Sequence, residues 1–89
     1  MKLTVGQRVR IQDDAFEFGG VVGTIDFPPD GLLELDPQPW IGPFRYQKRK
    51  RETVLVYWVR FDEPADDGSG DGPYWGSEIV ESDLQPIIE

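Results

Sequence analysis

The chain has 89 residues, of which 38% are hydrophobic, and its 17 acidic and 9 basic side chains give a net charge of -8. This length predicts one small domain with a single core, because chains of this size bury only about 60–65% of the surface that their unfolded form exposes. The sequence contains no Cys and no His. That absence excludes a disulfide framework and thiolate or imidazole metal sites, and it removes the commonest nucleophile and base side chains.

The N-terminal residues show no apolar leader segment, and no stretch approaches the roughly 20 consecutive apolar residues that cross a bilayer. We therefore expect a cytoplasmic protein without a membrane partner. The net charge of -8 opposes non-specific attraction to nucleic acid and to anionic lipid. A protein partner, with basic charge, is favoured over both.

The first third of the sequence predicts two short strands. Residues 8–11 alternate between polar and aliphatic side chains, which is typical of a half-buried strand. Residues 21–27 predict a second strand that bends at Gly23 and ends at two prolines. The loop between them is polar at its start and carries Phe16 and Phe18, which we expect to fold back over one end of a barrel.

Residues 28–52 form a long connection. Residues 32–35 are a candidate short strand, but Pro and Gly occupy 4 of the 9 positions from 36 to 44, which argues against regular structure. Trp40, Ile41 and Phe44 are too apolar for a solvated linker, so we expect them to pin the connection to the domain. A connection of this length is typical of a functional or mobile segment.

Residues 53–61 predict the central strand, because almost all of them are β-branched or aromatic. The second alternating set ends on Arg60 and is expected to be partly covered and partly available to a partner. The first set is apolar throughout and predicts the inward face: Leu55, Tyr57, Val59 and Phe61.

The rest of the chain predicts a loop and two further strands. Three glycines and two prolines within residues 62–73 argue against a strand there. Residues 74–80 resume β character and are expected to pair antiparallel with the central strand. Residues 82–84 predict one helical turn capped by Ser82, and residues 86–88 a last edge strand. The architecture expected for residues 1–89 is one all-β barrel of about five strands.

Four stretches resemble the SH3-like small β-barrels: Gly-x-x-Val-x-Ile at residues 6–11, Gly-x-x-Gly-Thr-Ile at 20–25, the long aromatic strand, and Ser-Asp-Leu-x-Pro-Ile at 82–87. Within that superfamily the pattern is similar to photosystem I reaction-centre subunit IV, the variable chain of ferredoxin-thioredoxin reductase, and KOW modules. The resemblance covers most of the chain except residues 28–52. It implies a closed barrel with a docking role and transfers no site residues. A ferredoxin partner is acidic, so the contact surface implied by the resemblance is basic.

A cluster of cations directly precedes the central strand and is the first candidate site. Its alternatives are a protein-docking patch, an RNA or DNA surface in which aromatics accompany cations, a solvated loop, and a hairpin edge whose lysines discourage strand pairing between molecules. The cluster comprises Arg45, Lys48, Arg49, Lys50 and Arg51.

An acidic loop follows the central strand and is the second candidate. Its spacing does not match a calcium-binding loop, and we predict no metal site. The alternatives are mutually repelling carboxylates on a flexible tip, an acidic face for a cationic partner, and a weak calcium site. The loop comprises Asp62, Glu63, Asp66, Asp67 and Asp71.

Five aromatic side chains are the third candidate, as a groove for a partner. The alternative is that a small domain needs them as core. They are Trp40, Phe44, Trp58, Tyr74 and Trp75.

No catalytic residues and no cofactor are predicted, because no nucleophile has a visible base and no Gly-rich phosphate loop precedes a helix. The sequence favours a non-catalytic module that binds a protein, either as an accessory subunit or as an acidic inhibitor of a basic partner. The alternative is a KOW-like RNA-binding module that uses residues 45–51.

Overall fold

The computed structural model describes residues 3–30, 39–68, 70 and 72–88. Its strands form one antiparallel, six-stranded sheet, which confirms the all-β prediction. In chain order the elements are β1 (Arg8–Ile11), β2 (Val22–Ile25), β3 (Phe44–Arg49), β4 (Glu52–Ala65), β5 (Tyr74–Val80), the short 3-10 helix η1 (Glu81–Asp83) and β6 (Leu84–Pro86).

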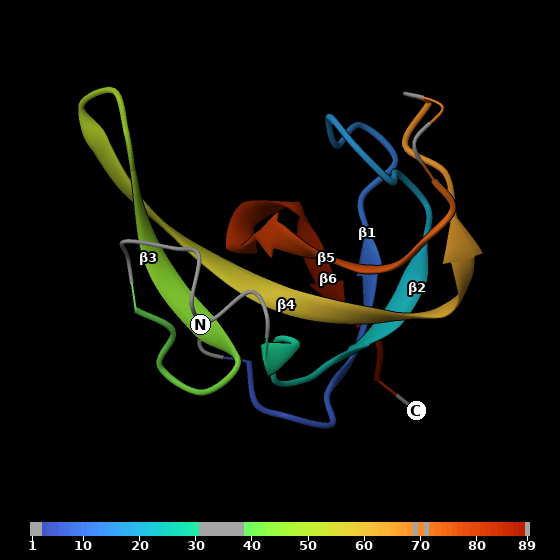
Figure 1. The fold of residues 1–89 in the computed structure, drawn as a ribbon, viewed down its shortest axis with the longest axis horizontal. Helices are drawn as coiled ribbons and strands as arrows, with labels where there is room; N and C mark the ends of the chain where they lie inside the picture. The colour runs from blue at the N-terminus through green and yellow to red at the C-terminus, as the bar shows by residue number, and fades with distance from the viewer. Residues whose placement is uncertain (1–2, 31–38, 69, 71, 89) are drawn as a thin grey trace.

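Strand β4 pairs with three other strands and holds the sheet together (Figure 1). Its first half, residues 52–57, pairs with β3, and residues 59–61 pair with β2. Because β5 pairs with residues in both of these ranges, β3 and β2 must share one edge of β4 and β5 must occupy the other. Beyond β2 come β1 and then β6.

The sheet is not closed into a barrel. β5 and β6 lie at the two ends of the order β5-β4-β2-β1-β6, and no ladder joins them within the described residues. β6 has only 3 residues and each of them pairs with β1. The expected closed cylinder is therefore replaced by an open sheet, with η1 linking its two end strands.

The inward face of β4 is the predicted one. Tyr57 and Val59 are fully buried, Phe61 is 2% exposed, and the half-buried Leu55 packs against the core. Side chains from the other elements complete the core cluster: Leu3, Val9, Ile11, Phe18, Ile25, Ile79 and Leu84.

The hydroxyl of Tyr57 ties the N-terminal segment to this core. It accepts the backbone N–H of Leu3 at 2.9 Å and lies 3.4 Å from a carboxylate oxygen of Glu81, to which it donates. Burial raises the pKa of the Tyr57 phenol, and its bond to Leu3 opposes that shift. The phenol therefore stays protonated and able to donate at neutral pH.

Strand β4 extends beyond the predicted central strand, through Asp62 and Glu63 to Ala65. The prediction that the acidic loop cannot hold a strand is wrong for these residues. The register between β4 and β5 shifts between Arg60 and Ala65. Pro64 falls within this irregular stretch, where its missing N–H costs no ladder bond.

The long connection also ends earlier than predicted. Residues 44–49 form β3, which makes a hairpin with β4 across a turn at Lys50 and Arg51. The basic cluster therefore lies on a hairpin rather than in an irregular segment. The candidate strand at 32–35 falls outside the described residues.

Two details of the C-terminal region differ from the prediction. The helical turn begins at Glu81, and its N-cap is Val80 with no side-chain hydrogen bond, so Ser82 is not the cap. The last strand, β6, begins at Leu84 and ends at Pro86, so it overlaps the predicted 86–88 range only at Pro86. The shift places Leu84 in the core and leaves Ile88 94% exposed.

Candidate binding surface

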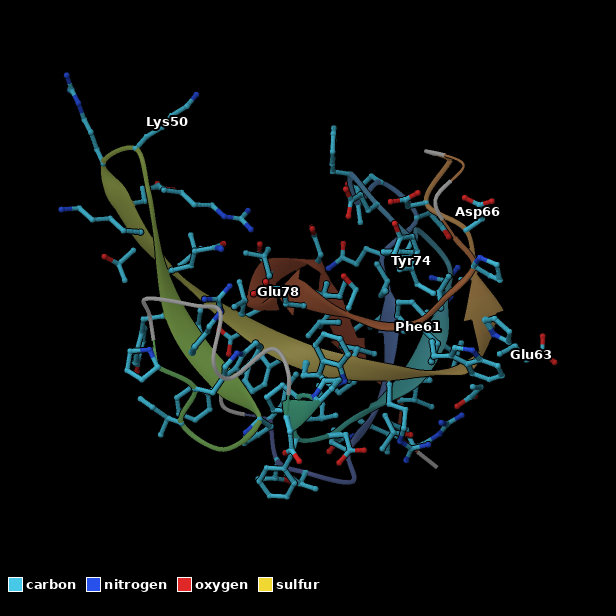
Figure 2. The ribbon with its side chains drawn as sticks, viewed as in Figure 1. Lys50, Phe61, Glu63, Asp66, Tyr74 and Glu78 are labelled. Carbon is cyan, nitrogen blue, oxygen red and sulfur yellow. The ribbon has the colours of Figure 1, made fainter. Side chains whose placement is uncertain are left out.

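The basic cluster divides into an exposed and a buried part. Lys48, Arg49, Lys50 and Arg51, here called the tip cations, are exposed around the β3–β4 turn. Figure 2 shows Lys50 at the end of this hairpin, pointing away from the body of the molecule. Arg45 is 3% exposed, so the expectation of a five-residue patch is corrected to four.

Arg45 is buried because it forms an ion pair with a residue of another strand, Glu78. Its Nε and Nη2 donate to the Glu78 carboxylate at distances of 2.5–2.9 Å. The ring of Trp40 lies over the guanidinium, with its centroid 5.2 Å from Cζ. The sequence gives no signal for this contact, because Arg45 and Glu78 lie on different strands, β3 and β5, which flank β4.

The two-residue loop at the end of the hairpin has a positive φ at its first residue, as such loops ordinarily do. Lys50 has a φ of 51°, in the left-handed region that glycine and asparagine ordinarily occupy. Beside the turn, Arg49 Nε donates to Gln47 Oε1 at 2.7 Å. Within the described residues, no ion pair involves Lys48, Lys50 or Arg51.

The five predicted aromatics do not form one groove. Phe44 packs on the core face against Tyr57, at 5.8 Å between ring centroids, and Tyr74 packs edge-on against Phe18 at 5.9 Å. Trp58 lies on the opposite face of β4, close to Gly76, while Trp40 covers Arg45. Only Trp75 is largely exposed, at 66%.

The acidic segment is partly engaged within the molecule. Both Asp62 carboxylate oxygens accept from Arg8 at 2.6 Å, and Asp66 Oδ1 accepts the backbone N–H of Gly68 at 2.8 Å. Glu63 is exposed and Asp67 is half-buried, while Asp71 lies outside the described residues. Over the described part of the chain, no group of three or more acidic side chains is arranged to hold a metal ion.

The hydrogen bonds from Arg8 lower the pKa of Asp62 below its ordinary value of 3.8. A carboxyl with a lowered folded-state pKa stabilises the fold above its unfolded pKa, and that contribution is lost as pH falls through the folded pKa. We expect the difference in unfolding free energy between wild type and Asp62→Asn to be constant at neutral pH and to shrink below about pH 4. Denaturant titrations over that range measure it. Arg8→Gln should remove the same pH-dependent difference, and a difference unaffected by Arg8→Gln would refute the pairing.

The tip cations and the acidic segment at residues 62–66 lie at opposite ends of the molecule. The hairpin tip and the segment that carries Glu63 and Asp66 are separated along the longest axis, which measures 32 Å (Figures 1 and 2). The Debye length at physiological salt is about 8 Å. The acidic segment at residues 62–66 is therefore largely screened from the tip cations, whose nearest carboxylates are Glu52 and those of the hollow that Arg49 lines.

Two shallow hollows lie on the surface. One, of about 380 Å³, runs beside residues 20–22 and 62–65. The other, of about 340 Å³, is lined by Phe16, Glu17, Arg49, Glu78, Ile79, Val80 and Asp83.

The hollow that Phe16 lines brings together residues that the sequence analysis did not group as one site. Phe18 folds onto Phe61 as expected, with 4.9 Å between ring centroids, but Phe16 is 95% exposed. The predicted packing of both aromatics is thus wrong for Phe16. The only sequence signal for an exposed Phe16 side chain is the acidic residues close to it, Asp13, Asp14 and Glu17.

No protein-family model matches the chain, and neither a curated protein nor a solved structure matches it significantly. Among the described residues, no helix has the length and apolar composition needed to cross a membrane.

Proposed function

We propose that this chain is a non-catalytic docking module with an SH3-like strand arrangement, and that its β3–β4 hairpin binds an anionic surface on a protein partner. The strand order β5-β4-β2-β1-β6, with one turn of 3-10 helix before the last strand, supports the SH3-like arrangement. The position of the four tip cations on a projecting hairpin carries the docking proposal.

The conformation of Lys50 is a second argument for the tip. A lysine in the left-handed region costs about 1 kcal/mol relative to glycine. The turn keeps a cation at a position where glycine would be more stable. Strain of this kind is concentrated at binding and switching loops.

The opposite end of β4 is a weaker candidate for the docking surface. Asp62 is already bound by Arg8, and Asp66 accepts a backbone N–H of its own turn. A basic partner at this end would have to compete with both contacts. The tip cations Lys48, Lys50 and Arg51 face no such internal competition among the described residues.

RNA binding is the second candidate, because Tyr46 is 45% exposed and shares a strand face with Lys48. An exposed aromatic ring beside cations can stack on a base while the cations contact phosphates. Binding to RNA would weaken steeply with salt and would be lost after ribonuclease treatment.

Affinity capture from an extract of the source cells, with a tip variant in which all four tip cations are replaced by glutamine, tests the proposal. We expect wild type to retain a protein that the tip variant loses, with less than about 0.5 kcal/mol change in stability because all four side chains are exposed. A matched control, Glu63→Gln with Asp66→Asn, should retain the partner. Capture that survives ribonuclease identifies a protein, and capture lost with ribonuclease identifies RNA. Equal capture by wild type and the tip variant would refute the proposal.

A further inference from the structure

One stretch of β4 has an open edge. Residues 52–55 pair with β3 on one side, but β5 ends at Val80, which pairs with Val56. Beyond that point no described strand covers the second edge of β4. Because η1 follows β5 directly and packs against β4, the part of β4 that is available for further pairing is residues 52–54.

The backbone groups on this edge can be assigned from neighbouring bonds. The Trp58 N–H donates to the Pro43 carbonyl, and the Trp58 carbonyl accepts from Asp26, so Trp58 faces the edge shared by β3 and β2. Because N–H and C=O alternate in direction along a strand, those of Thr53 face the open edge, whereas those of Leu55 face Glu81 of η1, which directly follows the Val56–Val80 pair. Among the described residues, no backbone hydrogen bond outside the strand ladders involves Thr53.

The hollow that contains Phe16 lies where β5 ends. Glu78, Ile79 and Val80 form one side of it, Glu17 and Asp83 add carboxylates, and Arg49 of the same copy also lines it. The Glu78 carboxylate is bound by Arg45. Neither Glu17 nor Asp83 forms an ion pair with a described residue. An extended segment on the open edge would therefore reach an acidic hollow with an exposed aromatic ring at its rim.

The best occupant for both features is a second copy of this chain. We propose that two copies form a symmetric dimer in which residues 52–54 pair antiparallel with the same residues of the other copy, centred on Thr53. Antiparallel pairing about Thr53 puts Arg51 of one copy opposite Leu55 of the other, next to the end of β5. The tip cations of each copy thereby approach Glu17 and Asp83 of its partner.

The arrangement satisfies the requirements of a two-fold interface. An isologous contact uses the same patch on both subunits, and this patch carries both the cations and the carboxylates that receive them. Open edges in other proteins are protected by charge, whereas here the charges adjoining the edge are complementary to those of a second copy. The inference is independent of the proposed function, although a partner bound to the tip would compete with the dimer.

Sedimentation equilibrium of the intact chain, combined with charge exchange, tests the dimer. We expect wild type to dimerise at physiological salt, and Lys50→Glu with Arg51→Glu to weaken dimerisation at least tenfold because attraction becomes repulsion. Glu17→Lys with Asp83→Lys should weaken it similarly. An equimolar mixture of these two variants should restore dimers that contain one copy of each. A wild type that stays monomeric up to about 1 mM, or a dimer unaffected by either reversal, would overturn the inference.

Thr53→Pro provides a separate backbone test. Its lost N–H faces the open edge, so the ladder with β3 is kept while the added pairing is blocked. The variant is expected to be monomeric and to have the same free energy of unfolding as the wild-type monomer, whereas Thr53→Val should dimerise. A Thr53→Pro variant that folds and dimerises like wild type would contradict the proposed edge. If this variant does not fold, the two charge-reversal variants decide whether the dimer forms as proposed.

Discussion

Replacing Arg45 with alanine is expected to lower the free energy of unfolding by about 3 kcal/mol. Arg45 is 3% exposed, while Glu78 keeps 29% of its side-chain surface in contact with solvent. Removal of the guanidinium leaves the Glu78 carboxylate half-buried without the donors that now bind it. The exposure of Glu78 places the expected loss at the lower end of the range for broken buried pairs.

Denaturant unfolding of a short series of variants checks this expectation. Arg49→Ala is the matched control, because Arg49 lies on the same strand and is exposed, and its loss should cost less than about 0.5 kcal/mol. Arg45→Lys should recover only part of the loss, since an ammonium cannot bind both carboxylate oxygens as a fork. With Glu78→Gln, a double-mutant cycle should reveal strong coupling. Equal losses for Arg45→Ala and Arg49→Ala would mean that Arg45 is a solvated member of the basic cluster.

Gly23→Ala is expected to destabilise the fold by about 3 kcal/mol. A Cβ at Gly23 would lie 2.4 Å from the carbonyl oxygen of Arg60 and 2.8 Å from a methyl group of Val59. The first of these is backbone in the central strand, so the clash can be relieved only if β2 moves away from β4. Such a movement would weaken the pairing that joins the two halves of the sheet.

Thermal and denaturant unfolding of Gly23→Ala measure this cost. Gly72→Ala is a suitable control, because the nearest atoms to its added Cβ, at 3.3 Å, belong to the Tyr74 ring, which can shift. The control should lose less than about 1 kcal/mol. A Gly23→Ala variant as stable as this control would show that β2 does not approach β4 as closely as described here.

The strands that could be predicted are those with a clear pattern in their local sequence. β1 was found because its apolar side chains recur at every second position, β5 because its two ends are β-branched or aromatic, and the inward face of β4 followed from its uninterrupted apolar set. Gly23 was correctly placed inside a strand, although its role is close contact with Arg60. These features depend on local sequence, so they can be predicted from one amino-acid sequence alone.

A hairpin edge was only one of several alternatives for the basic cluster, and strand β3 itself was not predicted, because it is polar and its strand conformation depends on pairing with β4. The burial of Arg45 depends on Glu78, which is 33 residues away, and only the register of three strands brings them together. The open sheet has a similar cause, since the resemblance implied closure while the pairing of β6 with β1 alone does not supply it. Each of these features depends on contacts between residues far apart in the sequence, and such contacts cannot be inferred from local periodicity.

Amide chemical-shift mapping of the isotope-labelled chain with its captured partner tests the central claim most directly. Docking through the hairpin predicts the largest shift changes at residues 46–52, with residues 62–66 little affected. The changes at 46–52 should diminish as salt is raised, because exposed charges are screened. Changes centred on residues 62–66 or on Trp75, with the tip unaffected, would contradict the account.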